Sequence, residues 1–278
     1  MTLAGRNVRF RPANVMISVG RAGRRRGKGG EAARDRGNGR PALRWPAVAP
    51  APGRRRAGRA RQDQEATARL SAEALAAGDP TGWFERLYTE AERVDSTVPW
   101  DRESPHGLLV EWATARELSG AGRRALVVGC GYGRDAEYLG RLGFATTAFD
   151  ISPTAVRVAR ERHPGSPVTY VTADLLDPPA DWRRGFDLVL ESMNVQALPP
   201  RVREAAFGAV GEPVAPGGTL LVIAAGREDE EDPPAAPPWP LTRGEIDAFG
   251  RSGLTPVRVE DLRDTGILRW RAEFHRPA

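Results

Sequence analysis

A glycine-rich turn between an apolar run and a helical segment is the feature that most constrains the fold. Residues 125–129 are short and apolar on both faces, as in the central strand of a parallel sheet, and Gly129, Gly131 and Gly133 lie at alternate positions. Such glycines let the backbone turn sharply and approach a ligand, and the amides of the following helix favour polar or anionic groups. A ligand-binding loop is expected, and a turn without a ligand is the alternative.

Strand and helix patterns alternate around this loop. Helix starts are marked by Ser152-Pro153 and by a capping box over residues 242–245. Alternation of this kind predicts a doubly wound parallel sheet. We expect strands at 125–129, 145–149, 168–172, 186–191 and 219–225, and helices at 64–77, 81–94, 105–118, 133–142, 153–163, 200–211 and 242–252.

The C-terminal part has a different pattern. Residues 256–262 are typical of a strand, and residues 268–274 alternate apolar with charged side chains, as in an antiparallel strand with one wet face. Thr265-Gly266 supplies the turn between them. The sequence therefore predicts an α/β, Rossmann-like, doubly wound seven-stranded sheet. It is mostly parallel, ends in an antiparallel hairpin and carries helices on both faces.

Charge divides the chain into two regions. Residues 1–61 hold 17 of the 41 basic residues and 2 of the 36 acidic ones, a net charge of +15, against −10 for residues 62–278. We expect residues 1–61 to be a disordered Arg/Gly-rich extension, because they contain too little apolar surface to offset chain entropy. A transit peptide, a nucleic-acid-binding arm and an upstream start codon are the interpretations that remain. The acidic remainder argues against a nucleic-acid partner.

Composition excludes several kinds of site. One cysteine, Cys130, rules out an internal disulfide and a Cys-cluster zinc site, and the three histidines lack metal-ligand spacing, so no metal is expected. No apolar run approaches the roughly 20 residues of a membrane helix, and no secretory signal is visible. We expect a cytoplasmic monomer without a membrane partner.

Acidic residues follow three of the expected strands. Asp150 lies 21 positions after Gly129, where a carboxylate accepts hydrogen bonds from a ribose diol. Asp174 is placed to accept from an adenine amino group or to cap a turn, and Glu191 ends the fourth strand at the same edge. The spacing is G-x-G-x-G, with Arg134 where a dinucleotide fingerprint has Gly. These positions leave both a nicotinamide dinucleotide and S-adenosylmethionine open.

Together, these motifs resemble those of class I S-adenosylmethionine-dependent methyltransferases over residues 100–278. The resemblance rests on the glycine loop, Asp150, Ala173-Asp174, residues 186–191 and Pro216-Gly217-Gly218. It implies that the glycine loop surrounds the methionine part of the cofactor, Asp150 holds the ribose and Asp174 contacts adenine. The implied cofactor-binding residues are Gly129, Cys130, Gly131, Tyr132, Gly133, Asp150, Ile151, Ala173, Asp174, Leu175, Glu191 and Trp100.

A narrower resemblance is to the thiopurine and thiol/halide methyltransferases. It rests on Val98-Pro99-Trp100, Pro105-His106, residues 196–200 and residues 236–239. It implies that helices within 62–120 form a lid of the 62–278 domain. Trp83, Tyr88 and Trp100 are then lid aromatics, with ordinary packing as the alternative for Trp83 and Tyr88. Ser192 departs from thiopurine-type members, which carry an Arg at this place near the substrate.

The implied reaction is methyl transfer from S-adenosylmethionine to a small-molecule acceptor, with a thiol or another soft nucleophile as one acceptor class. Glu191 is the candidate catalytic base, and holding the cofactor amino group is its alternative role. Asn194 and Gln196 are candidates for orienting the acceptor or for capping their own loop. The rival functions are a nicotinamide-dependent oxidoreductase and a nucleic-acid-interacting protein that uses the basic arm.

Overall fold

The sheet of the computed structural model has seven strands in the order β3-β2-β1-β4-β5-β7-β6. The model describes residues 54–93, 98–264 and 266–278. Strands β1 to β5 run parallel, and β7 pairs antiparallel with both β5 and β6, so the predicted sheet and its terminal hairpin are confirmed. The bounds are β1 Arg124–Val128, β2 Ala145–Asp150, β3 Thr169–Thr172, β4 Phe186–Ser192, β5 Val214–Ala225, β6 Thr255–Asp264 and β7 Ile267–His275.

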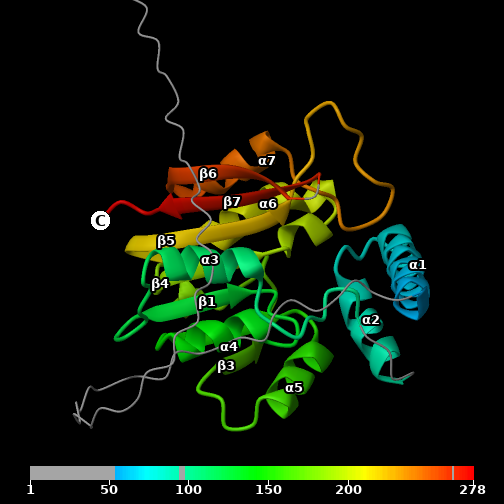
Figure 1. Cartoon of the computed structure of the whole chain (residues 1–278), viewed down its shortest axis with the longest axis horizontal. Coiled ribbons are helices and arrows are strands. Elements are labelled where there is room, and N and C mark those ends of the chain that lie inside the picture. The colour runs from blue at the N-terminus through cyan, green and yellow to red at the C-terminus, as the bar shows by residue number, and fades with distance from the viewer. Residues whose placement is uncertain (1–53, 94–97, 265) are drawn as a thin grey trace, which may run out of the picture. The chain divides into compact units, whose positions relative to one another are not determined.

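Helices pack on both faces of this sheet, as predicted. One apolar cluster joins β1, β2 and β4 to α3, α4 and α5, and a second joins the other face to α6 and α7. Figure 1 shows α3 and α4 in front of the strands. The bounds are α3 Gly107–Ala115, α4 Arg134–Arg141, α5 Pro153–Arg162, α6 Pro200–Gly211 and α7 Arg243–Asp247.

Local capping determines where two of these helices begin. The Ser152 hydroxyl accepts a hydrogen bond from the Ala155 amide at 3.0 Å, and Pro153 occupies the first turn of α5. Thr242 and Glu245 form the predicted capping box of α7. The helix expected over 242–252 is divided, because α7 ends at Asp247 and residues 248–252 continue as a 3₁₀ turn.

Two further helices, α1 (Arg54–Ala76) and α2 (Gly82–Arg93), lie beyond the carboxyl ends of the parallel strands (Figure 1). Helix α1 begins ten residues before the expected start, so residues 54–61 belong to a helix rather than to the predicted extension. The rest of that expectation, residues 1–53, falls outside the described residues. Within the described part of the chain, no helix has the length and apolarity to cross a bilayer.

Helix α2 is attached to the start of α5 by one carboxylate. Glu85 accepts hydrogen bonds from the Thr154 hydroxyl at 2.7 Å, from the Thr154 amide at 3.2 Å and from the Ser152 hydroxyl. A carboxylate at a helix N-terminus is favourable because unpaired amides point toward it. The contact places α2 next to the end of β2, where Asp150 lies.

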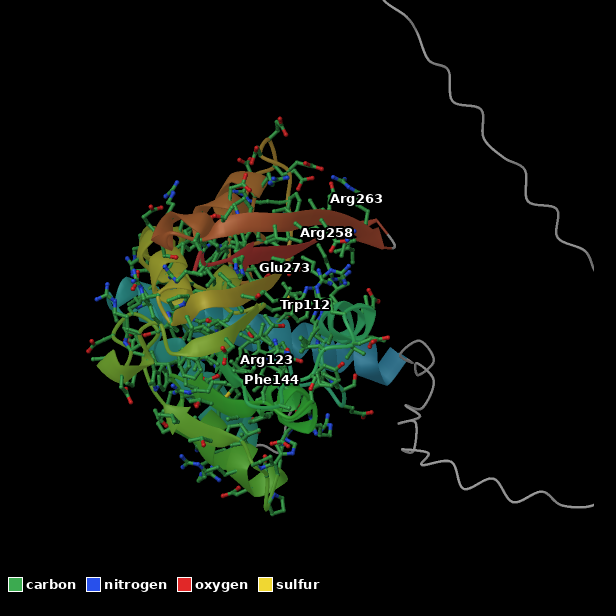
Figure 2. All side chains as sticks on the ribbon, turned by 90° about the vertical axis from the view of Figure 1, so that its left-hand side faces the viewer. Trp112, Arg123, Phe144, Arg258, Arg263 and Glu273 are labelled. Atoms are coloured by element: carbon green, nitrogen blue, oxygen red, sulfur yellow. The ribbon has the colours of Figure 1, made fainter. Side chains whose placement is uncertain are left out.

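Helix α3 is tied to β7 across one face of the sheet. The Trp112 indole donates to Glu273 at 2.9 Å, and Figure 2 labels both side chains. The same view labels Arg123 and Phe144, which make a cation–π contact at 4.9 Å. Arg123 and Phe144 directly precede β1 and β2, so their contact lies at the amino-terminal edge of the sheet.

Candidate cofactor site

A cavity of about 370 Å³ opens at the carboxyl ends of the parallel strands, under α1 and α2. Ligands of open α/β sheets bind at this edge. Ten of the twelve residues predicted to hold a cofactor line it, and only Gly133 and Glu191 do not. The ten are Trp100, Gly129, Cys130, Gly131, Tyr132, Asp150, Ile151, Ala173, Asp174 and Leu175.

The glycine loop requires glycine for two different reasons. At Gly129, φ is +58°, and a Cβ would stand 1.7 Å from the Asn194 side-chain nitrogen, so the loops after β1 and β4 are in close contact. Gly133 begins α4 with φ +88°, and a Cβ there would stand 2.2 Å from the Tyr170 hydroxyl. Gly133 therefore acts through packing beneath the cavity.

Asp150 connects two loops and lines the cavity. Its Oδ2 accepts from the Gly131 amide at 2.9 Å and its Oδ1 from the Ser152 amide at 3.0 Å. Burial raises its pKa from 3.8 to about 6, against the opposing effect of these two amides. Each carboxylate oxygen has two lone pairs, so each can still accept a hydrogen bond from a ligand hydroxyl.

Asp174 has the turn-capping role that was one of its two expected roles, and its contact with adenine stays a prediction. Its Oδ1 accepts from the Leu176 amide at 2.8 Å, which makes a local turn after β3. The same residue lines the cavity together with its neighbours Ala173 and Leu175. The turn orients the carboxyl group without using its second oxygen, Oδ2, in any hydrogen bond with the described residues.

The three candidate lid aromatics form one cluster above the loop. The Trp100 indole donates to the Tyr88 hydroxyl at 2.7 Å, and the Tyr88 ring meets Tyr132 edge to face at a centroid distance of 5.2 Å. Trp83 meets Trp100 in the same way at 6.0 Å. All three line the cavity, and Trp83 and Tyr88 are also core residues, so their packing role is confirmed and the lid role stays a prediction. The buried Trp83 indole N–H has no partner among the described residues.

Glu191 lies behind the loop after β4 and outside the cavity lining. It is fully buried, and its Oε1 accepts from the Asn194 and Val195 amides, both at 2.8 Å. Burial raises its pKa from 4.5 to about 7, and Oε2 has no partner among the described residues. This geometry corrects the expectation of a base in contact with the acceptor: Glu191 shapes the loop that carries Ser192, Met193 and Asn194.

The raised pKa of Glu191 predicts a pH-dependent stability. A buried carboxyl with a folded pKa of about 7 favours folding below its unfolded value of 4.5, and this contribution disappears as the pH rises through 7. Between pH 4.5 and 7.5, the unfolding free energy of wild type should therefore fall by up to about 3 kcal/mol relative to that of Glu191→Gln. Denaturant unfolding across this range measures it, and a constant difference would contradict the prediction.

Asp135 and His106 belong to the site but were not among the predicted residues. Asp135, in the first turn of α4, accepts from the His106 amide at 2.7 Å and pairs with the Ser192 hydroxyl. The His106 Nδ1 accepts from the Leu108 amide at 3.2 Å, and burial lowers its pKa to about 4, so the ring is neutral. The sequence feature that could have indicated Asp135 is its position just after the glycine loop.

The loops after β4 and β5 form the far wall of the cavity. Gln196 accepts from the Ala225 amide at 2.6 Å through Oε1, and its carbonyl accepts from the Trp239 amide at 2.8 Å. The side-chain oxygen of Gln196 therefore anchors the loop, and capping this loop was one of the two roles expected for Gln196. The contact brings Pro237 and Pro238 to the cavity.

Comparison with known proteins identifies the central segment. Residues 125–218 match a family model described as a methyltransferase domain. This segment is therefore similar to a methyltransferase domain. It contains the glycine loop, Asp150, Asp174 and Glu191, and the seven-stranded sheet around it has the fold of class I methyltransferases.

Two curated relatives of the methyltransferase domain act on different acceptor types. The chain is 33% identical over 132 residues to the ubiquinone biosynthesis O-methyltransferase of Xanthomonas axonopodis pv. citri (strain 306), covering 44% of this chain and 54% of that one. It is 30% identical over 135 residues to thiocyanate methyltransferase 1 of Brassica oleracea, covering 46% and 57%. The chain thus spans about half the length of the curated relatives it matches.

A solved structure extends the fold comparison over most of the chain. The 1,6-didemethyltoxoflavin-N1-methyltransferase of Burkholderia thailandensis, with 1,6-didemethyltoxoflavin and S-adenosylhomocysteine bound, superimposes with a TM-score of 0.53 at 17% identity. The match covers 84% of this chain and 94% of that chain. The shared feature is the fold.

Proposed function

We propose that this protein is an S-adenosylmethionine-dependent methyltransferase that acts on a small-molecule acceptor. The observation that carries the proposal is the meeting of the glycine loop, Asp150 and Asp174 around one cavity inside a methyltransferase domain. S-adenosylmethionine is the cofactor, and the presence of S-adenosylhomocysteine in a protein of the same fold supports this.

The residues around the cavity fit such a cofactor. Gly129 and Gly131 line the cavity, and the Asp150 oxygens retain lone pairs for two ribose hydroxyls. Asp174 lines the same cavity and is the residue that we propose to accept from the adenine amino group.

The cofactor supplies a methyl group on a sulfonium, which is already activated for transfer. The protein therefore contributes mainly orientation and exclusion of water. The cluster of Trp83, Tyr88 and Trp100 covers the glycine loop, and Glu191 holds the loop after β4 in shape from behind. Neutral His106, with a pKa of about 4, is a hydrogen-bond donor through Nε2 rather than a strong base.

The acceptor is a small molecule, and a thiol or another soft nucleophile is the class that we propose. The motifs around Trp100 and residues 236–239 support it, as does similarity to a thiocyanate methyltransferase. The similarity to ubiquinone O-methyltransferases supports an oxygen acceptor instead. Ser192, in place of the thiopurine-type Arg, does not support a thiopurine. The dispensability of residues 1–61, a monomeric state and a cytoplasmic location stay predictions.

Binding of the cofactor product tests the proposal directly. Calorimetric titration of the full chain should show micromolar binding of S-adenosylhomocysteine and no binding of NAD, because the loop has G-x-G-x-G spacing and Arg134 replaces the third dinucleotide glycine. Binding would justify a screen of thiols, halides and phenols as acceptors. Binding of NAD alone, or of neither compound, would contradict the proposed function.

A further inference from the structure

Arg203 is a buried charged residue on α6, outside the lining of the cavity. Its side chain is 3% exposed, and it shares the buried face of the helix with Phe207 and Val210. A buried charge is costly unless it is paired and hydrogen-bonded. Arg203 meets this condition through an ion pair with Glu245 at 2.6 Å and through hydrogen bonds to backbone carbonyls. A paired charge thus stands on a helix face that is otherwise apolar.

The Arg203 guanidinium joins two loops that are far apart in the sequence. Its Nε donates to the Leu198 carbonyl at 3.0 Å, in the loop after β4, and its Nη2 donates to the Trp239 carbonyl at 2.8 Å, in the segment after β5. Nη2 also donates to the Gln196 carbonyl at 3.4 Å. Carbonyls in loops lack the ladder partners of a sheet, and an arginine, with five donors in one plane, can satisfy several of them at once. Arg203 therefore fixes the position of one loop relative to the other.

The same two loops form the far wall of the cavity, which consists of residues 196–198 and residues 237–238. Two of the carbonyls that Arg203 binds belong to this wall, and the third belongs to Trp239, the residue that follows it. Apart from Gln196, the side chains of the far wall are apolar. Arg203 thus holds an apolar wall in place from behind, without contributing a side chain to the cavity.

The far wall and the residues proposed to hold the nucleoside come from opposite halves of the sheet. In the strand order, β4 and β5 lie on one side of β1, whereas β2, which ends at Asp150, and β3, which precedes Asp174, lie on the other. Because parallel strands end at one edge, the loops follow one another along the cavity in the same order. With the nucleoside at Asp150 and Asp174, the space beside the far wall is available to the methyl acceptor.

We propose that Arg203 is a positioning residue, which fixes the far wall and thereby the fit of the methyl acceptor. The inference rests on the proposed function and adds to it a residue that lies outside the cavity. The hydrogen bonds of Arg203 go to Glu245 and to the three carbonyls, so its loss should release the two loops. Asp150 and the glycine loop keep their own contacts. An apolar wall favours an acceptor with an apolar body, and such an acceptor is misaligned when the wall is displaced.

The experiment compares three variants of the full-length protein with wild type. Arg203→Met removes the charge and every donor. Arg203→Lys keeps a charge for Glu245, but an ammonium cannot reproduce the planar fork that binds the carbonyls. Arg251→Met is the matched control, because Arg251 pairs with Glu204 on the same helix, is 61% exposed and does not line the cavity. Thermal unfolding of all variants shows that only folded proteins are compared.

Hydrogen exchange followed by mass spectrometry measures the order of the far wall without a ligand. In both Arg203 variants, the amides of residues 194–199 and 236–241 should exchange at least about 10-fold faster than in wild type. These segments include the Trp239 amide, which donates to the Gln196 carbonyl. The amides of residues 125–133, in β1 and the glycine loop, should exchange at the wild-type rate. A general loss of stability would instead speed exchange in all three segments, and Arg251→Met should change none of them.

Kinetics with thiophenol and catechol as probe acceptors separate the effect on the acceptor from any effect on the cofactor. The KM for the acceptor should rise at least about 10-fold in Arg203→Met and less in Arg203→Lys. The KM for S-adenosylmethionine and the affinity for S-adenosylhomocysteine should stay within about twofold of wild type. The control should match wild type in every parameter. A smaller folded fraction would lower kcat and leave both KM values unchanged.

An unchanged acceptor KM, a parallel rise of both KM values, or uniformly faster exchange would overturn the proposal. Failure of wild type to bind S-adenosylhomocysteine would instead overturn the proposed function. In that case, and also where wild type binds it but methylates neither probe, hydrogen exchange alone decides. Faster exchange confined to residues 194–199 and 236–241 supports the role of Arg203, and uniform or unchanged exchange refutes it.

Discussion

Replacing Asp150 by Ala should weaken S-adenosylhomocysteine binding by about 10- to 100-fold. The carboxylate is buried at the floor of the cavity, and hydrogen bonds from ligand hydroxyls to a charged acceptor contribute about 1.5–3 kcal/mol. Because the pKa of Asp150 is about 6, wild-type affinity should also fall about 10-fold between pH 8 and pH 5, where most of the carboxyl is protonated. Titration calorimetry at both pH values measures each effect.

Asp187→Ala is the matched control for this prediction. Asp187 also accepts a backbone hydrogen bond, from the Arg124 amide at 2.7 Å, but it lies at the start of β4 and outside the cavity. Its loss should lower stability and leave the affinity unchanged. Asp150→Asn should remove the pH dependence, since an amide does not titrate in this range. Unchanged affinity in folded Asp150→Ala would exclude the ribose role.

Gly133→Ala should destabilise the protein by about 2–5 kcal/mol. A non-glycine residue at φ +88° costs about 1–2 kcal/mol, and the new Cβ would collide with the Tyr170 hydroxyl, forcing a displacement of the core. That hydroxyl donates to Glu137 on α4 at 2.7 Å, so the displacement also disturbs this hydrogen bond. Thermal unfolding should show a midpoint lowered by roughly 5–15 °C.

Gly165→Ala separates the two causes. Gly165 has φ +76°, but a Cβ there would meet nothing within 4 Å, so only the backbone term applies. Its destabilisation should be about 1–2 kcal/mol. If both variants lower the midpoint equally, the close packing of Tyr170 against Gly133 contributes nothing, and the steric part of the explanation is wrong.

The positions of most site residues followed from sequence because of one rule of parallel sheets. Residues that end successive parallel strands meet at one edge, so Gly129, Asp150 and Asp174 were expected to face one cavity, and they do. Period and capping signals predicted the helices in the same way, including the start of α5 at Ser152-Pro153. These inferences use only neighbours along the chain and the strand order.

Glu191 shows where this reasoning stops. Its place at the end of β4 is correct, but a strand-end residue can point into the cavity or behind the next loop, and neither spacing nor residue type distinguishes the two. The answer depends on the Asn194 and Val195 amides, which turn back toward the carboxylate. Asp135 was missed because its role depends on a contact with His106, which is 29 residues away in sequence.

The sequence by itself determined the architecture, the glycine loop and the edge at which a ligand binds, since these depend on local periodicity and on the geometry of parallel strands. Only the tertiary structure decided which polar groups are free to act. Folding pairs Asp101 with Arg162, encloses Glu191 and ties Arg203 to carbonyls behind the cavity. Partners distant in the chain, and the loss of water around buried groups, set that availability.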